Sequence, residues 1–209
     1  MKNIRISKGF ILCVLIVISV PLSLYLMAHT GNKKDINAIK SYDCDVKVFK
    51  LNTDISISSN GEKVYSVSGN ILRLLTDPLT LYDADGKVLA TAGDEYHIVN
   101  QDTHWIITDS EEIKMVGNFN LLGESYDIYI NDEKVAFAKF NNLNTYGTIV
   151  DNDGNIMADY SSRLFFKDYS IQITEHNIFS DAATNLIFAS YYSDQAADSS
   201  NGSNGSSSN

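Results

Sequence analysis

The fold of this chain is limited above all by short β-prone segments that alternate with turn residues along most of its length. Valine, isoleucine, threonine and tyrosine are frequent in these segments. Two of them, SYDIYIN and VAFAKF, alternate apolar with polar residues as half-buried strands do. The turns between segments read SNGEK, DADGK, NDEK and DNDGN. This pattern is typical of antiparallel hairpins and predicts a mainly β domain, closed as a barrel or packed as a sandwich.

Two of the turns stand in nearly identical surroundings. Residues 81–90 read LYDADGKVLA and residues 149–158 read IVDNDGNIMA, while residues 129–136, YINDEKVA, repeat the arrangement without the glycine. The start of a calcium-binding EF-hand loop looks similar. Such a loop needs oxygen ligands at its first, third and fifth positions, glycine at the sixth and glutamate at the twelfth.

The alignment to a calcium loop fails in both glycine-containing segments. With Gly154 at the sixth position, the first and twelfth positions are Ile149 and Tyr160. The same alignment of the earlier segment gives Leu81 and Ala92. Asparagine and aspartate tolerate left-handed backbone and glycine adopts it readily, so a hairpin turn explains the residues better. We therefore predict turns here, with no metal ion and no cofactor.

The amino-terminal segment is apolar enough to be a membrane anchor. Three basic residues lie within the flank of residues 1–8, and the nineteen residues 10–28 carry no charge. As a helix at about 1.5 Å per residue they would extend about 28 Å, close to the ~30 Å hydrocarbon core of a bilayer. This predicts a single transmembrane anchor over residues 9–28.

A cleaved signal peptide is the alternative, and it would make the body a secreted protein. The apolar region of such a peptide spans about 7–15 residues and ends in a small-x-small site. Ala28 would precede the cut, but Leu26 fits that site poorly, so the uncleaved anchor is preferred. The basic flank places the amino terminus in the cytoplasm and the body outside it. Lys33, Lys34 and Lys40 make the second flank basic as well, which leaves the opposite orientation open.

Charge restricts the partners of the body. All 26 acidic residues lie beyond residue 28 together with 13 of the 16 basic ones, so this part carries a net charge of −13. Nucleic acids and anionic lipid headgroups are bound through Lys and Arg clusters, and this field repels both. The expected partners are the lipid bilayer, through the N-terminal helix, and an unknown protein or lipid, but no nucleic acid.

The rest of the chain divides into three parts. Residues 29–42 are predicted to be a polar linker, helical around KDINAIK, residues 43–194 the folded domain, and residues 195–209 a disordered Ser/Gly/Asn tail. Cys13 lies in the apolar segment and Cys44 is alone in the body. No disulfide is therefore expected, and Cys44 is interpreted as a small core residue.

The last segment of the domain differs from the strands before it. Residues 179–192 read FSDAATNLIFASYY, and residues 182–193 carry no charge. Ser180 or Asp181 can cap a helix here. A helix that is apolar on all sides is buried, so we predict a helix in the core, with a final strand as the alternative.

This order of elements resembles the tubby C-terminal fold, and most of all its LURP-one-related and scramblase-like relatives. The resemblance implies a twelve-stranded barrel threaded by a hydrophobic helix, in a family whose members are variously linked to phosphoinositide binding, lipid association or unknown roles. The chain departs from the family because it has no Lys and Arg cluster for a phosphoinositide, so no ligand residue is carried over. The similarity lies within residues 69–194, in LTLYDADGKVLATA, YDIYINDEKVAFAKF, YGTIVDNDGNIMADY, YSIQI and AATNLIFASYY.

Few residues stand out as candidates for catalysis or metal binding. The histidines are His29, His97, His104 and His176, and none has another histidine or a cysteine three to five residues away. The common zinc spacing is therefore absent. A hairpin would bring Glu95, His97 and His104 together, although polar residues on a solvent face are the simpler interpretation.

The remaining polar and aromatic features favour structural roles. Ser110, Glu111 and Glu112 are predicted to form a charged turn, and Trp105 to pack in the core or at the barrel edge. The chain has no nucleophile elbow, phosphate loop or dinucleotide fingerprint. Two classes of function remain. The preferred one is a non-catalytic, membrane-tethered envelope protein that binds a partner; the alternative is an enzyme, for example a hydrolase, whose site assembles only in three dimensions.

Overall fold

A computed structural model describes residues 36–49, 52–70, 78–95, 103–118, 124–141, 145–162 and 168–202 of the chain. The predicted anchor at residues 9–28 and the alternative cleavage position at Ala28 lie outside these residues. Within the described ranges, no helix is both long and apolar enough to cross a bilayer.

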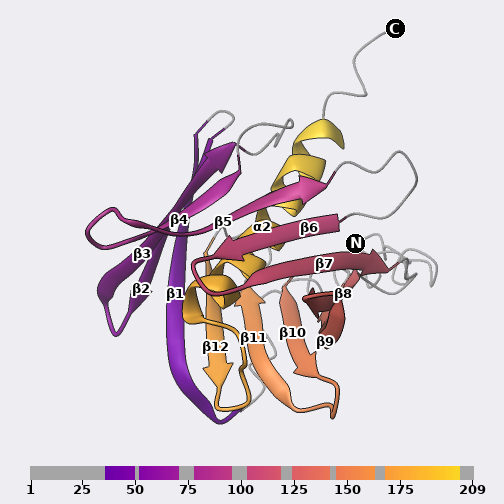
Figure 1. The fold of residues 1–209 in the computed structure, drawn as a ribbon. Helices are drawn as coiled ribbons and strands as arrows, with labels where there is room; N and C mark the ends of the chain where they lie inside the picture. Colours follow the sequence, from indigo (N-terminus) through magenta and orange to yellow (C-terminus); the bar gives the residue numbers. More distant parts are fainter. Residues whose placement is uncertain are drawn as a thin grey trace, which may run out of the picture.

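Twelve antiparallel strands close into a barrel, in which each strand pairs with its neighbours in sequence and β1 pairs with β12 (Figure 1). The predicted mainly β barrel is confirmed, and a sandwich is ruled out by the closure. The strands are β1 (Ala38–Phe49), β2 (Asn52–Ser59), β3 (Glu62–Asn70), β4 (Leu79–Asp83), β5 (Val88–Glu95), β6 (Thr103–Thr108), β7 (Glu112–Asn118), β8 (Ser125–Ile130), β9 (Glu133–Phe140), β10 (Tyr146–Asp151), β11 (Ile156–Ser162) and β12 (Tyr169–Thr174).

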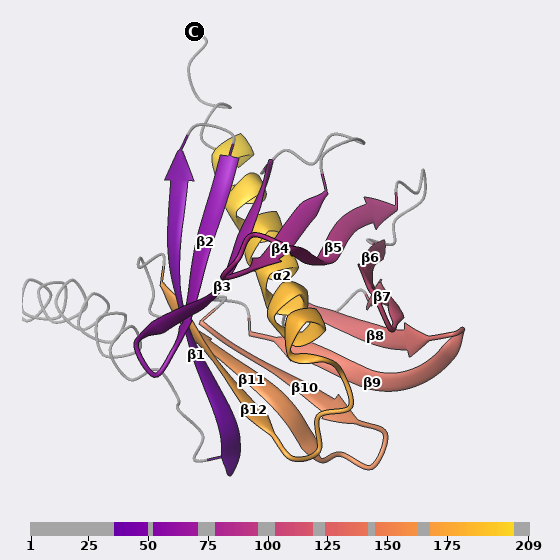
Figure 2. The same cartoon turned by 60° about the vertical axis from the view of Figure 1, so that its left-hand side comes forward.

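Helix α2 (Asp181–Gly202) lies inside the barrel (Figures 1 and 2). Every residue from 183 to 191 is buried, so all faces of this part of the helix are covered. The helix packs against β4, β5 and β6. In β9 and β11, the rings of Phe140 and Tyr160 lie 6.2 and 5.7 Å from the ring of Phe188. The predicted buried helix is confirmed, and the alternative of a final strand is wrong.

The helix begins where the sequence predicts but ends later. Ser180 Oγ accepts a hydrogen bond from the backbone N–H of Ala183 at 3.1 Å, which makes Ser180 the N-cap. Phe179 before it is 5% exposed. The backbone continues as helix to Gly202, so the disordered tail predicted over residues 195–209 is wrong for residues 195–202, and residues 203–209 lie outside the described residues. Once a helix has formed in the core, each further residue adds one backbone hydrogen bond to it.

Strand β1 begins earlier than the sequence predicts. The linker expected over residues 29–42, with its helical turn, is wrong from Ala38 onward, because β1 starts there. Residues 40–44 pair with residues 169–173 of β12. This pairing buries Tyr42 and Cys44, which are 5% and 1% exposed. Burial and cross-strand packing outweigh the polar local composition, and the interpretation of Cys44 as a core residue is confirmed.

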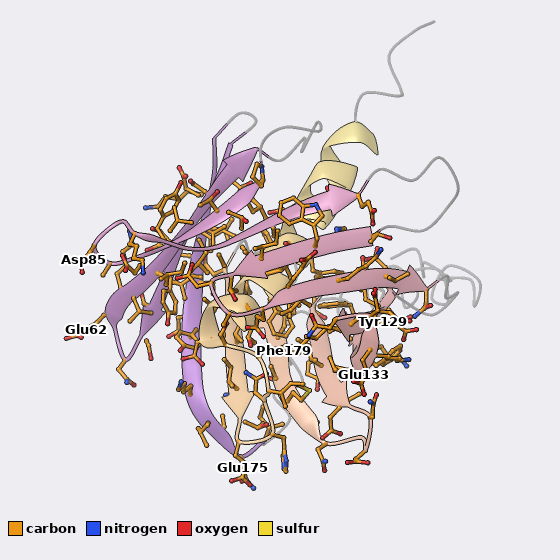
Figure 3. All side chains as sticks on the ribbon, viewed as in Figure 1. Glu62, Asp85, Tyr129, Glu133, Glu175 and Phe179 are labelled. Atoms are coloured by element: carbon orange, nitrogen blue, oxygen red, sulfur yellow. The ribbon has the colours of Figure 1, made fainter. Side chains whose placement is uncertain are left out.

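The β4–β5 hairpin closes with a turn built on the first acid of its DADG sequence. Asp83 Oδ1 accepts hydrogen bonds from the backbone N–H groups of Asp85 at 3.0 Å and Lys87 at 2.8 Å. Gly86 has a φ of 83°, the left-handed conformation that glycine adopts readily. Figure 3 shows Asp85 at the tip of this hairpin, away from the barrel.

The β10–β11 hairpin repeats this turn atom by atom. Asp151 Oδ1 accepts hydrogen bonds from the backbone N–H groups of Asp153 at 2.9 Å and Asn155 at 2.8 Å, and Gly154 has a φ of 86°. A hydrogen bond from the Asn155 side chain is the main reason that the pKa of Asp151 lies below its ordinary value. The predicted hairpin turns are therefore confirmed in both segments.

The third predicted turn, between β8 and β9, also contains left-handed backbone but has no glycine. Asn131 and Asp132 have φ values of 51° and 63°, as the two central residues of a type I′ turn require. Asparagine and aspartate are the residues other than glycine that accept this conformation most easily.

Replacing Gly154 with valine is expected to lower the free energy of unfolding by about 1–2 kcal/mol, the cost of left-handed backbone for a side chain with a Cβ. A Cβ atom there meets nothing within 4 Å, so the cost arises in the backbone alone. Gly154→Asn is the matched control and should lose much less, because asparagine tolerates positive φ. Urea unfolding measures both variants. Stabilisation by millimolar calcium that disappears in Asp151→Ala would contradict the turn interpretation.

Candidate functional site

An open groove of about 510 Å³ lies at the end of the barrel where α2 begins. Ile39 and Lys40 of β1 and Tyr65 of β3 line it, and the rest of the lining comes from the end of β12, its connection to α2 and the first residues of α2. Figure 3 labels two lining residues, Glu175 at the outer end of this connection and Phe179 beside the helix. No pattern in the sequence predicts this groove.

Asp181, the first residue of α2, joins the helix to the barrel wall in the groove. Its Oδ2 atom lies 2.5 Å from Lys40 Nζ and accepts a hydrogen bond of 2.9 Å from the Tyr42 hydroxyl. A carboxylate in the first turn is also stabilised by the positive end of the helix dipole. The Lys40 side chain is 49% exposed, so the ion pair is partly screened by water.

The two tyrosines beside Asp181 are neutral hydrogen-bonding groups at physiological pH. Burial, and then the Asp181 carboxylate, raise the pKa of Tyr42 far above its ordinary value. The pKa of Tyr65 is raised for the same two reasons. Their ring centroids lie 6.0 Å apart. These phenols are therefore suited to holding a ligand or the helix in place and unsuited to proton transfer at neutral pH.

The groove has exposed apolar residues at its margin. Ile39 in the lining is 62% exposed, and Ile178, between lining residues Asn177 and Phe179, is 57% exposed. Elsewhere on the described surface, Val88 and Ile107 are the other large exposed hydrophobic residues. Ile39 therefore gives the groove lining an exposed apolar side chain of the kind found at binding sites, and Ile178 is next to the lining in the chain.

His104 is buried and not part of a solvent-exposed polar face. It is 6% exposed and pairs with Asp94 across β5 and β6, with Nδ1 2.8 Å from Asp94 Oδ1. Its ring lies 5.4 Å from that of Tyr126. The simpler sequence interpretation is thus wrong for His104. Burial does not alternate strictly along β6, because the adjacent residues Thr103 and His104 are both buried. An alternating pattern therefore does not identify His104 as a buried residue.

The structure tests only part of the prediction that Glu95, His97 and His104 lie close together. Glu95 is opposite Thr103 in the ladder, and its Oε2 lies 3.2 Å from Lys114 Nζ. His97 lies outside the described residues. Within those residues, no group of three His, Cys, Asp or Glu side chains is arranged to hold a metal ion.

The predicted charged turn has a specific role at the start of the helix. Glu111 Oε1 accepts a hydrogen bond from the backbone N–H of Ser180 at 3.0 Å. Thr108 organises the turn, with Oγ1 accepting hydrogen bonds from the backbone N–H groups of Ser110 and Glu111. Glu111 therefore satisfies a donor just before α2, a contact that no local sequence pattern indicates.

Two glycines in strands lie directly beneath aromatic rings. Gly93 is opposite Trp105 and Gly147 is opposite Phe140, and an added Cβ atom would lie 2.4 and 2.3 Å from those rings. The aromatic ring covers the space that the glycine leaves. The interpretation of Trp105 as a packing residue is confirmed. A glycine within a β-prone segment is the sequence feature that indicates such a close contact at both positions.

The buried tyrosines predict a loss of stability in alkali. Burial raises the pKa values of Tyr160 and Tyr169, which are 1% and 4% exposed. A raised folded-state pKa gives stability that is complete below the unfolded pKa of about 10 and declines as pH rises above it. Each tyrosine should cost about 1.4 kcal/mol per pH unit in this range. In an alkaline titration, the part of the tyrosinate absorbance that is lost in Tyr160→Phe and Tyr169→Phe should appear at the same pH as the loss of circular dichroism. Its appearance while the chain is still folded would contradict this.

Burial raises the pKa of Cys44 to about 12, so its thiol is neutral and weakly nucleophilic. The groove lining includes apolar side chains, the neutral phenol of Tyr65 and the Lys40–Asp181 ion pair, which are groups that hold a ligand. No family model, no curated protein and no solved structure matches this chain.

Proposed function

We propose that this chain is a membrane-anchored, non-catalytic binding protein, with a tubby-like barrel domain that takes a protein or lipid partner in the groove at the start of α2. The groove is the observation that carries the proposal, because it combines about 510 Å³ of open space with exposed apolar margins. The central helix in a twelve-stranded barrel supports the resemblance to the tubby fold.

The barrel interior is a poor place for a ligand. Leu186, Ile187 and Phe188 of α2 are fully buried, as are Phe140 and Tyr160 on the surrounding strands. Side chains at this density leave little free space, so a ligand would have to displace the helix. Binding is therefore placed at the surface.

The test of binding is photocrosslinking in native membranes. A photoreactive phenylalanine in place of Ile39 or Ile178 should give a crosslinked adduct with one partner, identified by mass spectrometry as protein or lipid. Ile107 is the matched control, an exposed isoleucine on β6 that is not part of the groove. Equal adducts at all three positions, or none at Ile39 and Ile178, would refute the proposal.

The membrane anchor is tested separately. The full-length chain is expected to stay in the membrane fraction after carbonate and high-salt washes, because its uncharged residues 10–28 are long enough to span a bilayer. Protease added outside intact cells should digest the body in the proposed orientation. A mature chain that starts at His29 would contradict the anchor and indicate a secreted protein.

A hydrolase is the second candidate, and the contact of Asp94 with His104 favours it. A carboxylate on Nδ1 of a histidine orients the ring as in catalytic triads. If this histidine activates a serine, a fluorophosphonate probe should label the chain, and His104→Gln should abolish the label in a folded protein. The binding proposal expects no label in either protein.

A further inference from the structure

Strand β1 pairs with two different strands, and only a short stretch of β1 belongs to both pairings. Its first part pairs with β12 from Ala38 to Cys44, and its later part pairs with β2 from Asp43 to Phe49. Only Asp43 and Cys44 have partners on both sides. On the side of β2, residues 38–42 have no strand partner among the residues that the structure describes.

The β2–β3 hairpin leaves this edge open because it turns back too early to cover it. Strand β2 ends at Ser59, and Asn60 and Gly61 reverse the chain with φ values of 54° and 81°. In Figure 2 the hairpin leans away from the part of β1 that runs beside β12. The open segment of β1 is about 16 Å long at about 3.3 Å per residue.

An open strand edge offers backbone groups to a further strand. Every second residue of an antiparallel strand directs its N–H and C=O groups to the same side. Ile39 and Lys40 belong to this edge and also line the groove. A strand added to β1 would therefore lie along the wall of the groove, with the exposed Ile39 as an apolar contact.

Charge around the edge selects a basic occupant. Asp43 lies at one end, and Glu175 follows Thr174, which pairs with Ala38 at the other end. Both acids are exposed, and neither has an ion-pair partner among the described residues. The positive charge of Lys40 is already paired with Asp181. Within the part of the chain that the structure describes, the edge therefore presents two negative charges without an ion-pair partner, on a body with a net charge of −13.

We propose that the open edge of β1, residues 38–42, binds an extended Lys- or Arg-containing segment of a partner protein by adding it as a further β-strand. This inference rests on the proposed function and specifies its partner. A second copy of the chain fits worse. Antiparallel pairing about the centre of the edge would place Lys40 opposite Lys40 and the acids of one copy near those of the other, which opposes pairing.

The test uses the full chain in detergent micelles and a fluorescein-labelled peptide of alternating lysine and valine, about nine residues long and so able to cover the edge. The peptide should bind saturably, as measured by fluorescence anisotropy. The same peptide with glutamate in place of lysine should bind at least tenfold more weakly. Two peptides methylated on alternate backbone nitrogens, one in each frame, should differ, because only one frame places its N–H groups on the edge.

Two matched variants separate the edge from net charge. Ile39→Lys adds a positive charge and removes an apolar contact at the edge, and should weaken peptide binding at least tenfold. Ile107→Lys adds the same charge on β6, elsewhere on the barrel, and should leave binding unchanged. Both isoleucines are exposed, at 62% and 44%, so neither change should unfold the protein. Thermal melting of the two variants checks this.

Three results would overturn the inference. The first is equal binding of both methylated peptides and the parent peptide, which would exclude strand addition. The second is sedimentation of the full chain as a dimer that Ile39→Lys dissociates, which identifies a second copy as the occupant. The third is binding of phosphatidylcholine vesicles by the chain cut from its anchor, lost in Ile39→Lys, which identifies a lipid surface. In each case, photocrosslinking at the groove can still succeed, so the broader proposed function is judged independently.

Discussion

A chain that ends at Ser180 is expected to lose cooperative folding altogether. Residues 183–191 of α2 are buried on all sides and fill the interior around which the strands close. Leu186, Ile187 and Phe188 alone should contribute about 1.5–3 kcal/mol each through burial. The total stability of a typical domain is only about 5–15 kcal/mol. Without the helix, the apolar inner faces of the strands would meet water, and the truncated chain should aggregate.

Thermal melting followed by circular dichroism measures this loss. A chain that ends at Gly202 is the matched control, because it keeps the whole of α2 and should melt like the full-length protein. A cooperative melt close to that of the control for the chain ending at Ser180 would mean that the helix is peripheral to the core. That outcome would contradict the barrel closed around a central helix.

Phe188→Ala is expected to lower the free energy of unfolding by about 3–5 kcal/mol, as for a large aromatic residue removed from a core. Phe188 has no exposed surface. Its ring stands edge-on to Phe140, with an interplanar angle of 85°, and stacks on Tyr160 at 20°. Phe140 in turn covers Gly147, so the ring cannot shift far to fill the space that Phe188 leaves.

Urea unfolding of Phe188→Ala, compared with the unaltered chain, measures the change. Ile178→Ala is the control, because Ile178 is 57% exposed, and it should change stability by less than about 0.5 kcal/mol. A loss below about 1 kcal/mol for Phe188→Ala would show that the interior relaxes around the gap, as a loosely packed core does.

The local features of the fold could be predicted because their causes lie within a few residues. The carboxylate of Asp83 bonds to a backbone group four residues later. The cap of α2 depends on Ser180 and a residue three positions further on. In each case the side chain and the backbone group that it satisfies are already neighbours along the chain, so local residue chemistry determines the contact.

The groove and the contacts at the start of α2 could not be predicted in the same way. Tyr42 and Asp181 are separated by 139 positions, and Glu111 and Ser180 by 69. Such pairs meet only after the barrel has closed around the helix. The early start of β1 has the same origin, because a polar segment becomes a strand when β12 is beside it.

By itself, the sequence determined the β-rich body, its hairpin turns, the net negative charge of that body, and a helix that is apolar on nearly all sides. The tertiary structure alone decided that, among the described residues, β1 pairs with both β2 and β12 over only two residues and has an open edge beside a groove where α2 begins. The physical reason is that turns and caps depend on short-range backbone hydrogen bonds. Strand register and exposed edges depend on how the twelve strands pack around the one buried helix.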